Sequence, residues 1–202
     1  MERTDSEIVA GLRRAEAAAF DAMYARYRAR IHGFLLRLSG RRDVAEDLFQ
    51  ETWINAARAA PRLREDTRLA PWLFTIARNE WVSHRRWSML DLSRVVTLGD
   101  DVHFASVRSA EPGPDEELAT SESVRALERA IGALPAALRE ALLLVAVEGF
   151  EPREAAEILG IKYDLLRQRV SRARAQLAAL VSERHGGQTE RRVDRGAEPG
   201  ER

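Results

Sequence analysis

Apolar residues in the first half of the chain recur at the three- and four-residue spacing that places side chains on one face of a helix. The clearest run extends from Phe20 to Leu38, with apolar residues at offsets 0, 3, 4, 7, 11, 14, 15 and 18, and Ser39-Gly40 predicts its end. One more helix is predicted before it and two after it. They are a short helix opened by the capping box Thr4-x-x-Glu7, a third helix that opens on Asp43-x-x-Glu46 and stops near Pro61, and a fourth from Pro71 to about Trp87.

The second half has its own helical pattern, beginning near residue 124. Five apolar residues share one helical face, and Pro135 then breaks the chain before a segment over 136–147. A short helix over Pro152–Leu159, a turn at Gly160 and a second helix from about Asp164, its expected N-cap, come next. This arrangement predicts a helix-turn-helix. The five residues are Val124, Leu127, Ala130, Ile131 and Leu134, and the side chains expected between the two helices are Ile158, Leu159, Ile161, Leu166 and Val170.

Composition supports an all-α fold. Ala (32), Leu (23), Arg (31) and Glu (21) supply 107 of the 202 residues, whereas Val, Ile and Thr together supply 27. The chain has no cysteine, which excludes a disulfide scaffold, an iron–sulfur cluster, a thiolate zinc site and a cysteine nucleophile.

Charge and polarity divide the chain into four parts, although the formal net charge is zero. Residues 1–95 sum to +4, residues 96–124 to −6 and residues 125–182 to +2, and the tail over 183–202 balances. We therefore expect two small helical domains joined by a flexible acidic linker. The expected boundaries are 5–95 for the first domain, 96–122 for the linker, 123–182 for the helix-turn-helix domain and 183–202 for a disordered tail.

Three polar clusters are candidates for function, and each has a plainer interpretation. The third helix carries Asp47, Gln50, Glu51 and Asn55 as one polar stripe, which is either a solvated face or a docking surface for a partner protein. The fourth helix mixes tryptophans with arginines, as single-strand nucleic-acid sites do, but such tryptophans also serve as core anchors. The last helix carries an arginine-rich face with one glutamine, which fits a DNA major groove or an ordinary solvated hairpin.

Enzymatic chemistry finds no support in the sequence. The four histidines, His32, His84, His103 and His185, are scattered without metal-ligand spacing or a triad partner. No nucleophile or glycine-rich phosphate loop accompanies the carboxylates. We expect no catalytic residue, no metal, no cofactor and no small-molecule substrate.

Five short motifs follow one another along the chain. They are Asp47-Leu48-Phe49-Gln50-Glu51-Thr52-Trp53, Pro71-Trp72-Leu73-Phe74-Thr75-Ile76-Ala77-Arg78-Asn79, Leu134-Pro135 with Arg139, Glu154-Ala155-Ala156-Glu157-Ile158-Leu159-Gly160, and Arg172-Ala173-Arg174. Their ordered combination resembles bacterial RNA polymerase sigma factors, and more narrowly the extracytoplasmic-function (ECF) subfamily, which keeps only regions 2 and 4. The resemblance covers about residues 5–95 and 120–180.

The resemblance implies three groups of site residues. Those implied to bind core RNA polymerase are Asp47, Gln50, Glu51 and Asn55. Those implied to melt and hold the −10 promoter element are Arg64, Arg68, Trp72, Arg78, Asn79, Arg85 and Arg86. Those implied to read the −35 element are Lys162, Arg167, Gln168, Arg169, Ser171, Arg172 and Arg174. Asp164-Leu165 replaces the Gly-Thr usual in the family, which leaves −35 specificity the least transferable part.

The implied partners are core RNA polymerase, promoter DNA and an anti-sigma factor. The alternative is a sigma-like decoy that sequesters an anti-sigma protein without binding promoter DNA, and the retained arginines argue against it. The polar N-terminus and the shortness of the longest apolar run, Ala141–Val147, predict a cytoplasmic protein with no membrane partner.

Overall fold

The computed structural model describes the backbone of residues 3–94 and 116–193, and the side chains of 3–88 and 124–181. These residues form helices and connecting turns without a β-strand, which confirms the all-α prediction. The elements are α1 (Asp5–Arg13), α2 (Ala17–Ser39), α3 (Arg42–Ala59), the 3-10 turn η1 (Ala60–Arg62), α4 (Leu69–Arg94), α5 (Glu116–Ala133), α6 (Ala136–Leu142), the π-helical turn η2 (Leu143–Val147), α7 (Pro152–Leu159) and α8 (Tyr163–Val193).

Helices α1–α4 form the N-terminal unit, in which α2 packs against α1, α3 and α4. The predicted capping box opens α1, since the Glu7 amide donates to Thr4 Oγ1 (3.3 Å) and the Thr4 amide donates to Glu7 Oε2 (2.7 Å). The left-handed conformation of Gly40, with φ 67°, ends α2 as predicted. The buried core of this unit contains the apolar face of α2 together with Val44, Leu48, Thr52 and Ala56 of α3 and Leu73, Phe74 and Ala77 of α4.

Helices α5–α8 form the C-terminal unit, which contains the predicted helix-turn-helix. Gly160, with φ 60°, turns the chain between α7 and α8. The side chains expected between these helices are buried or, for Ile161, partly buried. The helix-turn-helix prediction is therefore confirmed in its turn and in its packing.

Two predicted helix starts are wrong by one or two residues. Arg41, not a residue of the Asp43-x-x-Glu46 sequence, is the N-cap of α3, and the Asp43 carboxylate accepts from the Arg41 guanidinium, which lowers the pKa of Asp43. Asp164 is the second residue of α8 rather than its N-cap. In each case the acidic side chain lies in the first turn, where its negative charge interacts favourably with the positive end of the helix dipole, but it does not cap the helix.

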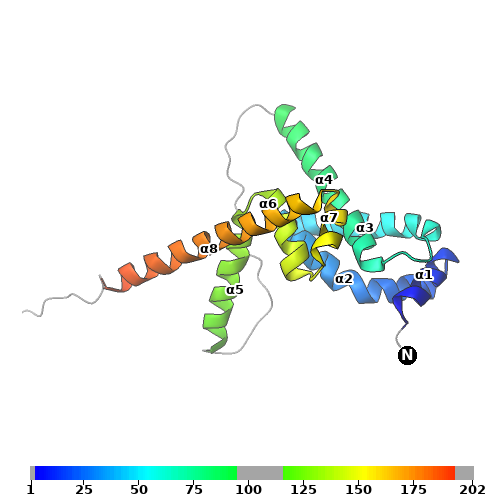
Figure 1. Cartoon of the computed structure of the whole chain (residues 1–202), viewed down its shortest axis with the longest axis horizontal. Coiled ribbons are helices and arrows are strands. Elements are labelled where there is room, and N and C mark those ends of the chain that lie inside the picture. Colours follow the sequence, from blue (N-terminus) through cyan, green and yellow to red (C-terminus); the bar gives the residue numbers. More distant parts are fainter. Residues whose placement is uncertain (1–2, 95–115, 194–202) are drawn as a thin grey trace, which may run out of the picture.

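Helix lengths and one helical face also differ from the predictions. Helix α4 runs from Leu69 to Arg94, and α5 begins at Glu116 within the expected linker, whose residues 96–115 lie outside the described part of the chain. Helix α8 continues to Val193, into the expected tail. Ala130 and Ile131 of α5 and Leu134, which follows it, are buried, but Val124 and Leu127 are 50% and 43% exposed, because the N-terminal part of α5 extends away from the other helices (Figure 1).

The two units are packed together, with α7 beside α4 and with α5 and α6 against α2 (Figure 1). The ring of Phe150, which follows η2, lies edge-on to Phe74 of α4 with centroids 4.9 Å apart, and Phe74 in turn contacts Phe34 of α2. Arg139 of α6 donates to the Leu38 carbonyl of α2 at 2.7 Å. The aromatic contact and this buried hydrogen bond join the units at their centre. No helix in the described residues is long and apolar enough to cross a membrane.

The close approach of α1 to α2 requires glycine at position 11, and this gives a stability prediction. A Cβ at Gly11 would lie 2.6 Å from Ala19 Cβ and 2.8 Å from Glu16 Oε2, whereas one at Gly33 would meet only the flexible end of Arg37 at 3.0 Å. We expect Gly11→Ala to lower the free energy of unfolding by about 1–3 kcal/mol through overpacking. Gly33→Ala should raise it by up to about 1 kcal/mol through helix propensity. Urea denaturation monitored by circular dichroism measures both, and equal effects would contradict the packing described.

Candidate nucleic-acid interface

The residues proposed to hold the −10 element lie along α4 and the loop that precedes it, and several contact the C-terminal unit. Arg78 is partly buried, and its Nε donates to Glu140 Oε2 of α6 at 3.4 Å. Arg68 forms an ion pair with Glu154 of α7. Asn79 is exposed. Two of the arginines that were predicted to contact DNA therefore form ion pairs with carboxylates of the same chain.

The loop between η1 and α4 is a short turn held by its own polar groups. The Arg64 amide donates to Thr67 Oγ1 at 3.0 Å, and the Thr67 amide donates to the Arg64 carbonyl at 3.1 Å. The Arg64 side chain is exposed and pairs with Asp66 at 3.0 Å. Arg64 is therefore exposed on a turn that these two hydrogen bonds close.

The aromatic residues of α4 divide between core and surface. Trp81 is buried and Trp72 packs partly against the core, as the core-anchor interpretation holds, whereas Trp87 is 68% exposed. The Arg85 guanidinium lies 5.8 Å from the Trp81 ring centroid, and Arg86 is exposed. The surface near the end of α4 thus combines one exposed indole with two arginines.

The predicted −35 residues lie on a solvent-facing side of α8. Lys162 precedes the helix, and the remainder lie on it between residues 167 and 174. Those that are exposed are Lys162, Arg167, Gln168, Ser171, Arg172 and Arg174, while Arg169 is partly buried. This arrangement exposes four cations, one glutamine and one serine on a single helix and the residue before it.

Sequence reasoning missed Tyr163 and Arg153 in the helix-turn-helix. The Tyr163 ring, 41% exposed at the start of α8, has the guanidinium groups of Arg153 and Arg167 at 5.8 and 5.9 Å from its centroid. These contacts orient one arginine from each helix of the motif. An aromatic residue directly after Lys162, with Arg four residues later, was the available signal.

The polar stripe of α3 is exposed except at one end. Asp47, Gln50 and Glu51 are exposed, and Ile54, which the sequence analysis did not single out, is 42% exposed on the same side. Asn55 is partly buried, and its Nδ2 donates to Glu80 Oε1 of α4 at 2.9 Å. The first three residues are thus available to a partner protein, whereas Asn55 joins α3 to α4.

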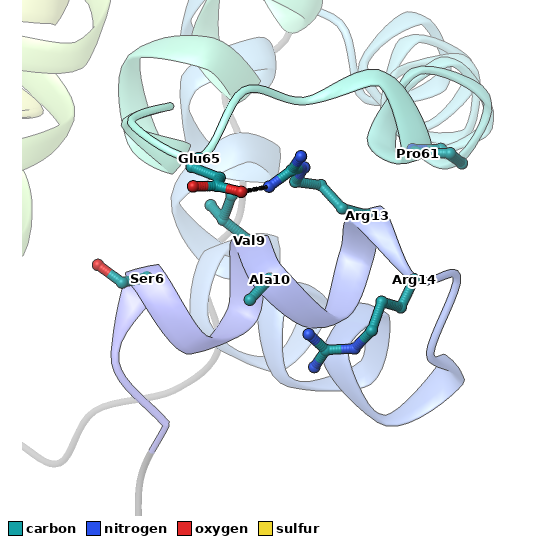
Figure 2. Close-up of a pocket in the computed structure, with 7 residues that line it drawn as sticks. All are labelled: Ser6, Val9, Ala10, Arg13, Arg14, Pro61 and Glu65. Carbon is teal, nitrogen blue, oxygen red and sulfur yellow. Dashed lines mark hydrogen bonds and ion pairs between the residues drawn. The ribbon is translucent and has the colours of Figure 1, made fainter.

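A hollow between α1 and η1 is lined by none of the predicted site residues (Figure 2). Arg13 forms an ion pair with Glu65 across it, and Arg14 pairs with Glu16 at 2.7 Å. Both arginines that line it therefore have carboxylate partners. Within the described residues, no cluster of three or more His, Cys, Asp or Glu side chains is suited to hold a metal ion.

The two units match two known protein families. Residues 23–88 match Sigma-70 region 2, and residues 124–177 match Sigma-70 region 4. The chain is 34% identical over 151 residues to the ECF RNA polymerase sigma factor EcfG of Rhodopseudomonas palustris, covering 75% of this chain and 78% of the relative. This chain belongs to the ECF RNA polymerase sigma factors. The sigma factor is also 32% identical over 168 residues to the RNA polymerase sigma factor CarQ of Myxococcus xanthus, with 82% and 90% covered.

Solved sigma factor structures have the same fold. The sigma factor RpoE, in a complex with the anti-sigma factor NepR from Bartonella quintana, matches with a TM-score of 0.65 and 29% identity, covering 81% of this chain and 96% of that one. CnrH, in a complex with the cytosolic domain of CnrY, matches with a TM-score of 0.63 and 24% identity, covering 89% and 97%. These similarities confirm the two-domain helical architecture of the sigma factor.

The different settings of Asn55 and Gln50 give a second prediction. Asn55→Ala should lower the free energy of unfolding by about 0.5–1.5 kcal/mol, because it removes the partly buried hydrogen bond to Glu80. Gln50→Ala, on the exposed side of the same helix, should change it by less than about 0.5 kcal/mol. Urea denaturation distinguishes them, and an unchanged stability for Asn55→Ala would show that the bond to Glu80 is unimportant.

Proposed function

We propose that this sigma factor brings core RNA polymerase to specific promoters, with the C-terminal unit reading the −35 element and the N-terminal unit melting and holding the −10 element. The exposed arginine face of α8 within a helix-turn-helix carries the proposal. Arg167 and Arg172 are exposed and suited to phosphates or guanine edges in a major groove, and the exposed Gln168 is suited to adenine. The polymerase performs the chemistry, and this chain supplies recognition.

The N-terminal unit is proposed to act on single-stranded DNA. Arg64, Arg68, Arg78, Arg85 and Arg86 offer cations to phosphates along one stretch of the chain, and aromatic rings of α4 accept stacked bases. Holding a base outside the duplex costs a few kcal/mol of unstacking, which phosphate contacts can offset. Because phosphate contacts dominate such affinities, binding should weaken strongly as salt rises.

The protein partners are proposed from α3 and from the relatives. Asp47, Gln50 and Glu51 form an exposed polar face, with Ile54 as an apolar contact, that suits a helix of core polymerase. An anti-sigma factor is a further proposed partner, since the similar sigma factor RpoE has been solved in a complex with the anti-sigma factor NepR.

In vitro transcription from a genomic-fragment library tests the function directly. Purified core polymerase would be incubated with and without this protein, and start sites would be mapped. Discrete new starts that share −35 and −10 sequences support the proposal. Binding to core enzyme without new starts would contradict autonomous promoter recognition, and failure to bind core enzyme would favour the decoy alternative.

The α3 face gives a prediction for polymerase binding. Asp47→Lys with Glu51→Lys should weaken binding to core polymerase by at least about tenfold, because charge reversal places cations where the partner is complementary to anions. Glu157→Lys, an exposed position on α7, is the control and should leave the affinity unchanged. Fluorescence anisotropy with labelled core enzyme measures the affinity of the wild type, the double variant and the control. An equal loss of affinity in both variants would show that α3 is not part of the interface.

The end of α4 gives a prediction for promoter melting. Arg85→Ala with Arg86→Ala should abolish open-complex formation at a mapped promoter while leaving core polymerase binding intact, because both phosphate contacts are lost. Arg28→Ala, an exposed arginine of α2, is the control. Permanganate reactivity of unpaired thymines reports melting, and normal reactivity with the double variant would contradict the assignment.

A further inference from the structure

The first turn of α7 carries a cation that the helix itself does not favour. Arg153 is the second residue of α7, whose start is closed by the capping box of Glu151 and Glu154. The positive end of the helix dipole lies there, and it disfavours a positive charge. The Arg153 side chain is exposed, and it forms no ion pair with any carboxylate of the described residues. Its charge is therefore not explained by the stability of α7.

A tyrosine ring of α8 holds this arginine beside a second one. The guanidinium groups of Arg153 and Arg167 lie 5.8 and 5.9 Å from the ring centroid of Tyr163, the first residue of α8. The electron-rich face of an aromatic ring attracts such cations. Arg167 is also exposed, and within the described part of the chain it too lacks an ion-pair partner. Two like charges from two helices are thus gathered at one ring.

The arginines that contact the other unit have a different setting. Arg68 forms an ion pair with Glu154, and Arg78 pairs with Glu140 at 3.4 Å. The charges of Arg153 and Arg167 are not balanced in this way, so an external anion that binds near both would relieve their repulsion. A guanidinium group matches the geometry of a phosphate, to which it can donate two parallel hydrogen bonds. The arginine pair at Tyr163 is therefore suited to a phosphate of a nucleic acid.

This arginine pair lies at one side of the surface proposed for −35 DNA. Gln168 and Arg172 are four residues apart and form one exposed row along α8. Tyr163 and Arg167 form a neighbouring row, on the side of α8 that faces Arg153 of α7. In helix-turn-helix complexes the second helix lies in the major groove, while the first helix crosses the DNA backbone. With the row of Gln168 in the groove, Arg153 would lie beside the sugar-phosphate backbone at its edge.

We propose that Arg153 is a further DNA contact of this sigma factor, to a backbone phosphate beside the −35 element, and that Tyr163 is the positioning residue that holds it next to Arg167. This inference rests on the proposed function and adds a contact from α7 to those on α8. Phosphate contacts fix the position of a protein on DNA but do not distinguish bases. Arg153 therefore contributes affinity, whereas sequence preference comes from the row of Gln168 and Arg172.

The first test measures the affinity of holoenzyme, assembled from core polymerase and the full-length chain, for a labelled promoter duplex and for the same duplex with a scrambled −35 element. Arg153→Ala should weaken binding to both about three- to tenfold, leave their affinity ratio unchanged and reduce the salt slope by about one. Gln168→Ala should instead lower the ratio. Arg129→Ala, an exposed arginine of α5, is the matched control and should leave both affinities unchanged. Equal affinities for the Arg153 variant and this control would overturn the proposal.

The second test asks whether the ring positions the arginine. Tyr163→Phe keeps the ring and should bind the promoter duplex within about twofold of the wild type, whereas Tyr163→Leu should weaken binding at least about threefold. In the Tyr163→Leu background, Arg153→Ala should cost less affinity than it does in the wild type, because the arginine is no longer held. Circular dichroism checks that each variant stays folded. Equal costs of Arg153→Ala in the two backgrounds would overturn the role of Tyr163.

Two comparisons separate this inference from the proposed function. A wild-type holoenzyme that binds the promoter and the scrambled duplex equally would contradict promoter recognition, and the inference with it. Wild-type preference for the promoter, together with an unchanged affinity for the Arg153 variant, would overturn the inference alone. Binding to core polymerase is measured without DNA as well. A loss there for Arg153→Ala would assign Arg153 to a protein contact and would also overturn the inference.

Discussion

The arrangement of the two units depends on one buried cation, Arg139. Only 7% of this residue is exposed, and its guanidinium donates to the carbonyls of Leu38 at 2.7 Å, of Leu134 at 2.9 Å and of Gly132. Leu38 lies in the last turn of α2, and Gly132 in the last turn of α5, where helices have unpaired carbonyls and the negative end of their dipole. Arg139 therefore joins the end of one helix from each unit, and removing it would leave buried acceptors without their donor.

This central contact carries an electrostatic cost. Burial first, and then the positive charge of Arg85, lower the pKa of Arg139 to about 10. Burial also raises the pKa of Glu148, against the opposing effect of its bond to Arg30. The ion pair of Arg68, whose side chain is 69% exposed, is of the kind that contributes about 0–1 kcal/mol. The peripheral ion pairs thus add little to the stability of the contact, and they set which charges are neutralised.

Local spacing predicted most of the helices, because caps and apolar periodicity act within a few residues of one another. Thr4 with Glu7, the glycines at 40 and 160 and the apolar face of α2 all behave as their sequence contexts indicate. Asp43 does not cap α3, because Arg41 takes the cap position and engages its carboxylate. Long-range partners were not predictable: nothing local to Asn55 indicates Glu80, and nothing local to Arg78 indicates Glu140. The sequence therefore predicts the residue types of the proposed site, but the pairing of Arg68 and Arg78 with carboxylates depends on how the two units pack.

The distance between the units in solution is the measurement that tests the account most directly. Because the chain has no cysteine, Ala25→Cys on α2 and Ala178→Cys on α8, both at exposed positions, place two spin labels without further substitution. Double electron–electron resonance on the free chain should give one narrow distance distribution. A broad distribution in the free chain would contradict the account.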